Sequence, residues 1–443
     1  MQIRTPAHNT APGYVFLAPK MVVAQAGPMI MDNRGEVVWF KPLNTRGVTD
    51  FRVQHYLGKP VLTWWRGHVS NVGVGDGWYV IYDTSYRPVA EVRPGNGLVG
   101  DVHEFLITKN NTAVFTVYHR LPVDLSAVGG PKKGTIWDGI VQEVDIKSKR
   151  VLFEWHSYPQ VGVGESYAPP PAAKAGAKAP PYDYFHINSI AVEPNGNFLV
   201  SARNTHTIYE IDRKTKKVLW RLGGKKSSFK MGKGTNFEWQ HDARRQANGT
   251  ITIFDNGAAP PVEKFSRILV LRVNPQTKKA TLVRALPPSE ETAGPVRRQC
   301  AVPAEREHLR RLGCRSRTSA SSRPKRQAAL RRVLRSRQAA GRRRRHVSRL
   351  PLRLARPADQ TGRSSWSRDD AAYASWNGAT DVVQWQVLAG PARRASCSPS
   401  RPWRRTASRL RSASASRPPS TAVKALGRNG RVLGTSAAVA PQP

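Results

Sequence analysis

The chain has 443 residues and a formal net charge of +41, from 71 Lys and Arg side chains against 30 Asp and Glu. Residues 1–293 hold 37 basic and 24 acidic side chains, a net charge of +13, whereas residues 294–443 hold 34 and 6, a net charge of +28. Because most of the charge lies in the last third of the chain, it does not make nucleic acid the partner of the rest. The length is enough for a large core and a second, smaller domain.

The positions of the cysteines and the hydropathy argue against a disulfide-bonded protein, a zinc protein and a membrane protein. All three cysteines, Cys300, Cys314 and Cys397, lie in the last third, and their spacing fits neither a disulfide framework nor a zinc site. No stretch approaches about 18 consecutive apolar residues, and none of signal-peptide length opens the chain. The sequence as it stands therefore predicts a soluble, cytoplasmic chain without a membrane span or a visible export signal.

Hairpin patterns recur between residues 29 and 286. The first type is a short apolar run ending in Asp or Asn, a polar turn, and an apolar run with an aromatic residue or leucine near its end. Its copies lie 51 to 67 residues apart, at 29–40, 79–92, 140–155, 207–222 and 268–283. A second type lies between them, at 104–118, 187–203 and 242–256, and contains the turn signals Asn195-Gly196 and Asn248-Gly249.

Two hairpins per period make four antiparallel strands, which is a blade of a β-propeller. We therefore predict an all-β chain with blades at about 50–92, 103–157, 186–224 and 241–286. The opening hairpin, about 13–40, is expected to be the outer half of a further blade. The Pro/Ala/Lys-rich stretch 168–181 is expected to be a surface loop, and no run is long enough for a substantial helix.

After residue 294 the period ends and Arg, Ala, Ser and Pro dominate, as in RRRRH at 342–346. Two orderly islands follow, at 371–391 and 421–439, and the first alternates apolar and polar residues around Trp376 and Trp385, as strands of a β-sandwich do. We therefore divide the chain into a propeller at 1–293, an aberrant or disordered segment at 294–370, and a sandwich remnant at 371–443.

Two explanations of the Arg-rich stretches stay open. One hypothesis is a shifted reading frame in a GC-rich gene, since such codons read out of frame give mostly Arg, Ala, Ser and Pro. Resequencing tests it, and an unbroken frame through 294–370 would end it. The alternative is a genuine disordered basic arm that contacts nucleic acid, although an arm does not explain the orderly islands.

Three hairpins begin with a histidine at or just before the first strand: His103, His186 and His241. The first strand of a propeller blade lines the central channel, so equivalent positions in successive blades converge near the axis. A single histidine here would ordinarily be a buried structural residue, but three at one position favour a site. Converging imidazoles serve as nucleophiles, general acids and bases, or metal ligands.

Polar residues near the histidines indicate what kind of group the site would bind. Asn188 follows His186 by two residues, so both side chains share one face of a strand, and Arg203 ends the second strand of that hairpin. A histidine, an amide and a guanidinium suit a group with several oxygens, such as a sulfuryl or phosphoryl group. Glu104 and Asp242 are expected on the opposite face of regular strands, so the pattern favours no metal.

Aromatic residues near these positions offer a surface for a flat apolar ligand, with blade-core packing as the alternative. We take Tyr184 and Trp239 as candidate substrate-binding residues and expect Trp64 and Trp65 to be core residues. The stretch RLGGKKSSF at 221–229 lacks the pattern of a phosphate-binding loop, so nothing indicates a nucleotide sulfuryl donor.

The strings GDVHEFLIT (100–108), DYFHINSIAVEPNGNFLVSARNTHTIYEIDRKTKKVLWRLGG (183–224) and WQHDARRQANGTITIFDNG (239–257) resemble the arylsulfotransferase family. The resemblance runs from about residue 11 to 290 and implies a six-bladed propeller. By that resemblance His241 matches the transiently sulfated histidine, and His186, Asn188 and Arg203 match the sulfuryl-binding and acid/base group. His103 matches the remaining channel histidine.

The resemblance implies transfer of a sulfuryl group from an aryl sulfate to a phenol by a ping-pong mechanism through a sulfo-histidine, without a cofactor. Relatives are usually exported, which implies a secreted or extracytoplasmic protein. The islands resemble the sandwich-like C-terminal region of some relatives. The fifth blade and the inner half of the sixth should fall within 287–370, where the sequence shows no strands.

Two other functions remain open. A non-catalytic propeller could bind a partner on its channel face, and the basic tail could bind nucleic acid. A coloured assay with a nitrophenyl sulfate donor and a phenol acceptor separates the first from an enzyme. Salt-dependent binding of random DNA by the tail would support the second.

Overall fold

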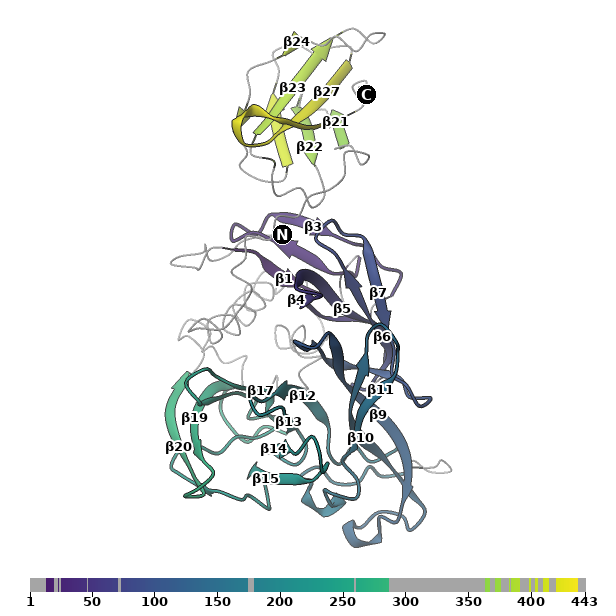
Figure 1. Cartoon of the computed structure of the whole chain (residues 1–443), viewed down its shortest axis with the longest axis vertical. Coiled ribbons are helices and arrows are strands. Elements are labelled where there is room, and N and C mark those ends of the chain that lie inside the picture. The colour runs from purple at the N-terminus through teal and green to yellow at the C-terminus, as the bar shows by residue number, and fades with distance from the viewer. Residues whose placement is uncertain are drawn as a thin grey trace, which may run out of the picture.

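The computed structural model describes residues 13–286, apart from 20–22, 24, 46, 71–72, 174–178 and 259, and shorter stretches between 363 and 436. The described residues are nearly all strand and loop, in antiparallel sheets that follow one another along an arc (Figure 1), which confirms the predicted all-β class. Helical structure within them is limited to three 3₁₀ turns: η1 (Ser126–Val128), η2 (Val163–Glu165) and η5 (Arg428–Gly430). None of the described helices is long and apolar enough to cross a membrane.

The N-terminal sheet has three strands where a hairpin was predicted: β1 (Val15–Leu17), β2 (Met29–Met31) and β3 (Val37–Phe40), in that order. Four units of four antiparallel strands follow, and they match the predicted blades. The first comprises β4 (Gly47–Tyr56), β5 (Lys59–Val69), β6 (Gly75–Tyr82) and β7 (Pro88–Val92), and the second β8 (Gly100–Ile107), β9 (Thr112–Val123), β10 (Gly134–Asp145) and β11 (Val151–His156).

The third and fourth units have the same meander. The third comprises β12 (Ile187–Val192), β13 (Phe198–Ala202), β14 (Thr207–Ile211) and β15 (Val218–Gly223). The fourth comprises β17 (His241–Arg245), β18 (Ile251–Asp255), β19 (Arg267–Asn274) and β20 (Lys279–Leu286), with β16 (Lys230–Met231) parallel to β20.

The Asp or Asn that ends the first strand of each recurring hairpin closes its turn. The Oδ1 of Asp32 accepts hydrogen bonds from the backbone of Arg34 and Glu36, both at 2.9 Å, and Asp212 Oδ1 accepts from Thr215 at 2.6 Å. Asp83, Asp145 and Asn274 make equivalent bonds. These side chains replace the backbone partners that a tight turn lacks, which explains why this residue type recurs at the position.

Units pack face to face through apolar side chains. One core cluster joins the first and second units, another the second and third, and a third the third and fourth. Trp64 and Trp65 are buried on opposite faces of β5, where Trp64 packs toward the N-terminal sheet and Trp65 toward the second unit. Both are core residues, as predicted. Strand β8 contacts β4 and β12, and β12 contacts β17, so the first strands line a common hub.

The first two units differ from separate blades, because β6 also pairs with β8 through Gly77 and Gly100 to give one eight-stranded sheet. The indole Nε1 of Trp65 donates to the carbonyl oxygen of Gly100 at 3.0 Å across this junction. Glycines allow it, because a Cβ on Gly100 would lie 2.8 Å from the carbonyl oxygen of Gly77.

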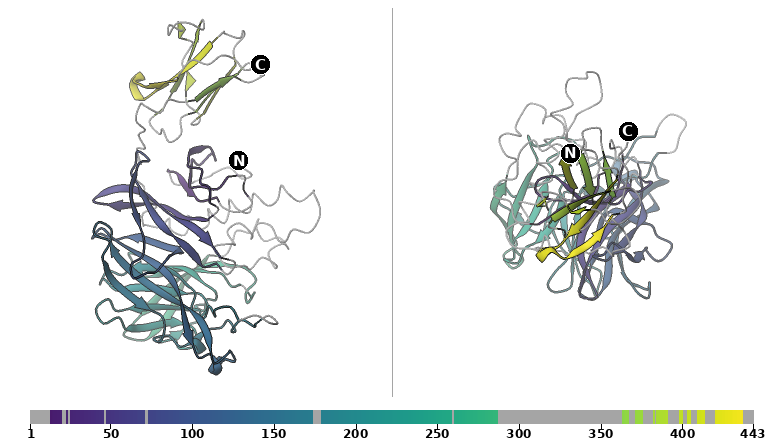
Figure 2. Two further views of the ribbon diagram at one scale, coloured as in Figure 1. Left: turned by 90° about the vertical axis from the view of Figure 1, so that its right-hand side faces the viewer. Right: turned by 90° about the horizontal axis from the view of Figure 1, so that it is seen from above.

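Beyond residue 362 two small sheets are described, drawn in green and yellow in Figure 2. One has the order β21 (Arg363–Trp366), β22 (Ala371–Ser375), β26 (Arg409–Ala413); the other β24 (Ser398–Pro399), β23 (Gln384–Gly390), β27 (Ser420–Leu426), β28 (Val432–Thr435), with β25 (Trp403–Arg404) on β23. Both predicted islands contain strands, and Trp385 is buried, whereas Trp376 lies outside the described residues.

The expectation that no strand lies within 287–370 is wrong at β21, which pairs with β22. Its sequence, RSSW, lacks an apolar alternation, so only the pairing identifies it. The remainder of 287–370 lies outside the described residues.

Candidate active site

The three hub histidines lie together. His103 is on β8, His186 directly precedes β12, and His241 opens β17. The ring centroids of His103 and His186 are 5.1 Å apart, and those of His186 and His241 are 6.4 Å apart. All three side chains are buried. The structure therefore brings these distant residues into one volume at the hub, with His186 as the neighbour of both others.

The first strand of each unit, β4, β8, β12 or β17, is irregular near the hub. Register shifts occur in all four, between Thr49 and Arg52, Gly100 and Phe105, Ile187 and Ser189, and His241 and Arg244. His186 and Asp242 have φ angles of 54° and 55°, a region that residues other than glycine rarely adopt. Bulges and strained backbone of this kind are concentrated beside active sites, where they redirect side chains.

His103 is held by a buried carboxylate. Its Nδ1 lies 2.5 Å from Oδ2 of Asp101, which is fully buried. Asp101 also accepts hydrogen bonds from the backbone of Gly75 at 2.8 Å and from the hydroxyl of Thr116 at 3.0 Å. Because a carboxylate only accepts, the Nδ1 of His103 carries a proton, and in the neutral ring the lone pair lies on Nε2.

His186 has the same arrangement with a different carboxylate. Its Nδ1 hydrogen-bonds to Oδ2 of Asp183. The chain after β13 holds this segment in place, since the backbone N–H of Arg203 donates to the carbonyl of His186 at 2.8 Å and the side-chain amide of Asn204 donates to the carbonyl of Asp183. The register of one hairpin therefore positions both His186 and Arg203.

His241 contacts neutral oxygens instead. Its Nδ1 lies 3.1 Å from the carbonyl oxygen of Trp239 and 3.0 Å from Oδ1 of Asn256. The carbonyl can only accept, so Nδ1 is a protonated nitrogen, and in the neutral form of the ring the lone pair lies on Nε2. A neutral imidazole with a fixed tautomer is the form that a nucleophilic histidine requires.

Asn188 and Arg203 complete the group. The side-chain amide of Asn188 donates to the carbonyl of Gln240 at 2.8 Å, and the guanidinium of Arg203 lies 4.7 Å from the ring of Trp239. Nε2 of His186, Oδ1 of Asn188 and Nε1 of Trp239 are buried without a hydrogen-bond partner among the described residues. Buried polar atoms are nearly always paired, so this set points to a bound polar group.

An aromatic stack adjoins the group. The ring of His206 meets Trp239 edge to face at 4.3 Å and stacks on Tyr167 at 4.1 Å. Burial, with help from the charges of Arg203 and Lys225, lowers the pKa of His206 to about 3. The sequence predicts only a structural or exposed role for His206, because it lacks the placement at the start of a blade.

Tyr184 is not part of the cluster. It is fully buried in the core between the second and third units, and its hydroxyl donates to the hydroxyl of Ser157 at 2.9 Å. Its aromatic neighbours are Tyr182 and Phe185. The structure thus brings together six of the seven predicted site residues and places Tyr184 in the core.

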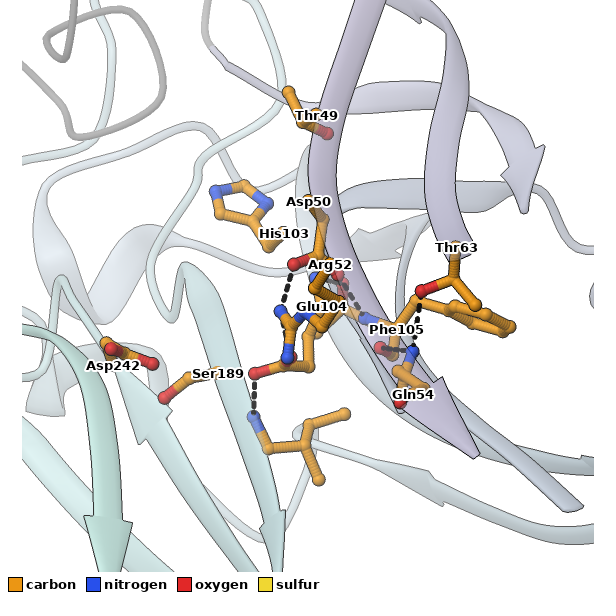
Figure 3. Close-up of polar contacts among 12 residues, drawn as sticks. Thr49, Asp50, Arg52, Gln54, Thr63, His103, Glu104, Phe105, Ser189 and Asp242 are labelled. Atoms are coloured by element: carbon orange, nitrogen blue, oxygen red, sulfur yellow. Dashed lines mark hydrogen bonds and ion pairs between the residues drawn. The ribbon is translucent and has the colours of Figure 1, made fainter. Parts of the chain in front are cut away.

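A network of charges lies beside His103 (Figure 3). The buried carboxylate of Glu104 accepts from Arg52 on β4 at 2.8 Å and from Arg244 on β17, while Arg244 also binds Asp242 at 2.8 Å. Burial raises the pKa of Asp50, a further carboxylate of the network, to about 7. Glu104 and Asp242 are engaged by an arginine, and no metal-binding group of three His, Cys, Asp or Glu occurs in the described part of the chain.

A cavity of about 580 Å³ lies next to this network, between β12, β17 and β18. Asp242 and Arg244 form part of its wall, whereas the three histidines do not line it. Arg245, also in the wall, binds the carboxylate of Glu193. The cavity is therefore adjacent to the histidine cluster and separate from it.

Comparisons with known proteins identify the family. A search of curated sequences gives no match. Similar solved structures include a Bacteroides caccae protein of unknown function, with 14% identity, 62% of this chain and 73% of that chain covered, and a TM-score of 0.34. The Dos1 propeller has 12% identity and a TM-score of 0.34, and the match covers 61% of this chain and 56% of that chain. A Lactobacillus plantarum protein has 8% identity and a TM-score of 0.33, and the match covers 97% of this chain and 83% of that chain.

These structural likenesses are distant. The sequence profile of the arylsulfotransferase (ASST) family, in contrast, matches residues 52–295, which is more than half of the chain and includes all three hub histidines. The chain belongs to the arylsulfotransferase family.

Proposed function

We propose that this protein transfers a sulfuryl group from an aryl sulfate to a phenolic acceptor through a sulfo-histidine on His241. The observation that carries the proposal is the convergence of three buried imidazoles whose Nδ1 atoms are all engaged. In the neutral form of each ring the lone pair therefore lies on Nε2, and His241 is the one whose Nδ1 contacts neutral oxygens.

In the first half-reaction, the lone pair of His241 Nε2 forms a bond to sulfur while the bond from sulfur to the aryl oxygen breaks. The departing phenolate takes a proton from a neighbouring histidine. In the second half-reaction, an acceptor phenol returns a proton to that histidine, and its oxygen attacks sulfur and releases His241. The two halves use the same atoms in opposite directions and need no cofactor.

Negative charge accumulates on the three non-bridging oxygens of the sulfuryl group during transfer. Around that position Arg203 supplies a guanidinium, Asn188 the amide hydrogen that the carbonyl of Gln240 does not use, and His186 an Nε2–H when its ring is protonated. All three side chains are buried. Donors fixed in a water-poor site stabilise such charge strongly. Loss of one of them is expected to lower the rate by about 10²- to 10³-fold.

The test uses the full chain with 4-nitrophenyl sulfate as donor and phenol as acceptor, and follows nitrophenol release and the sulfated product. His241→Ala is expected to abolish both. His55→Ala is the matched control, because His55 is an exposed histidine on β4 outside the cluster, and it should keep turnover within about twofold. Turnover by His241→Ala at the wild-type rate would overturn the proposal.

A further inference from the structure

The two carboxylates on the hub histidines differ in their surroundings. Asp101 is fully buried and accepts four hydrogen bonds, two of them from the ring and backbone of His103. Asp183 precedes β12, and its side chain is 18% exposed. Asp101 is therefore a fixed acceptor in the wall of the second unit, and His103 is the imidazole whose tautomer and position it determines.

Geometry assigns different tasks to the two carboxylate-bound rings. His186 is next to both other histidines, and the backbone of Arg203 is bonded to its carbonyl. It therefore belongs with the donors that surround the sulfuryl oxygens. In a displacement at sulfur the attacking and leaving atoms stand on opposite sides, so the proton donor for the leaving oxygen belongs on the side of His186 away from His241. His103 is the second ring beside His186, at 5.1 Å between the ring centroids, and is therefore the candidate for that donor.

We infer that Asp101 is the positioning residue for the proton donor of the reaction, in that it holds His103 with Nε2 toward the aryl oxygen. This inference rests on the proposed sulfuryl transfer. The imidazolium of His103 gives its Nε2 proton to the departing phenolate as the sulfur–oxygen bond breaks. The neutral ring then takes a proton from the acceptor phenol, and Asp101 stays ionised and offsets the imidazolium charge throughout.

Two donors of different leaving-group acidity provide the test. 4-Nitrophenolate departs without a proton, whereas the phenolate of phenyl sulfate needs one. Single-turnover formation of the sulfo-enzyme is followed by quenching and intact mass for both donors. In Asp101→Asn the amide no longer enforces the Nδ1–H tautomer, so we expect a loss of about 10²-fold with phenyl sulfate and less than about tenfold with 4-nitrophenyl sulfate.

Asp183→Asn is the matched comparison, and it should slow both donors by the same factor, because His186 contacts oxygens that are charged with either leaving group. His103→Gln should show the same donor dependence as Asp101→Asn, and the double variant should lose little more than either single one. If Asp101→Asn fails to fold, His103→Gln still carries the test.

An equal loss with both donors in Asp101→Asn and His103→Gln, or donor dependence in Asp183→Asn instead, would overturn the assignment of Asp101 while leaving sulfuryl transfer intact. Failure of the wild-type chain to form a sulfo-enzyme with either donor would instead refute the proposed function on which the assignment rests.

Discussion

Individual side chains decide which nitrogen of each hub histidine is available. Asp101 and Asp183 hold the Nδ1 of His103 and His186, and the carbonyl of Trp239 holds that of His241. A ring nitrogen bound to an oxygen that only accepts must carry the proton. The three imidazoles are therefore alike in tautomer, but Nδ1 contacts a carboxylate in His103 and His186 and a neutral carbonyl in His241. We assign proton exchange to the rings bound to carboxylates and nucleophilic attack to His241.

His206 gives a prediction about pH at this scale. Its pKa is lowered to about 3 by burial, so between pH 6.5 and 3 the unfolded chain binds a proton that the folded chain does not. The contribution to stability is complete above pH 6.5 and is lost as the pH falls, by up to about 1.4 kcal/mol per pH unit. Urea titrations between pH 7 and 4 should show that His206→Phe, which keeps the stack on Tyr167, flattens this dependence.

The control for that experiment is His55→Phe, at an exposed position on β4, which should leave the slope unchanged. A wild-type slope in His206→Phe would show that other groups govern the acid sensitivity.

The recurring hairpins form where an Asp or Asn side chain closes the turn between two strands. The hairpins closed by Asp32, Asp83, Asp145, Asp212 and Asn274 could be predicted because the closing residue is visible in the sequence and its hydrogen bonds are local. The bulges of the inner strands could not, because their residues form ordinary strand patterns and only cross-strand pairing reveals the shift.

The close approach of β5 and β6 at Gly77 gives a prediction about stability. A Cβ on Gly77 would lie 2.7 Å from the Cζ2 of Trp65 and closer still to the backbone oxygen of Arg66, which cannot rotate away. Gly77→Ala should therefore lower the free energy of unfolding by about 2 kcal/mol. Chemical denaturation measures it.

Gly162→Ala is the matched change, because nothing lies within 4 Å of a Cβ there and its φ of −71° suits any residue. It should alter the free energy of unfolding by less than about 0.5 kcal/mol. Equal effects of the two changes would contradict the close approach of β5 and β6 at Gly77.

Across the whole molecule, the site exists because inner strands from different units meet. Glu104 on β8 binds Arg52 on β4 and Arg244 on β17, and its second oxygen accepts from the backbone of Ile190 on β12 at 3.3 Å. One buried carboxylate thus connects all four units at the hub, beside the histidines. The same convergence positions the reacting groups and joins the four units to one another.

Replacing that carboxylate should destabilise the whole chain. Glu104→Gln leaves Arg52 and Arg244 without their shared buried anion, although Asp50 and Asp242 remain as partners. We expect a loss of about 3 kcal/mol in the free energy of unfolding. Glu91→Gln breaks an exposed pair with Arg93 at 3.5 Å and should cost less than about 1 kcal/mol. If Glu104→Gln also lost less than about 1 kcal/mol, the charged network would not be what joins the units.

The meeting of the histidines could be predicted from the sequence, since equivalent positions of a repeat converge by symmetry. Their partners could not. Asp101 and Asp183 precede their histidines by two and three residues, spacings that carry no signal by themselves, and Asn256 reaches His241 only through the pairing of β17 with β18. The place of Tyr184 in the core could not be predicted either, because proximity in sequence to His186 does not show in which direction a ring packs.

The central claim is that His241 carries the sulfuryl group between donor and acceptor. The most direct measurement is rapid quenching of the full chain with an aryl sulfate and no acceptor, followed by digestion under alkaline conditions and peptide mapping by mass spectrometry. The account predicts one SO₃ group on the peptide that contains His241, lost when phenol is added before the quench. Sulfated phenol formed without any modified peptide, or an SO₃ group on a different residue, would contradict it.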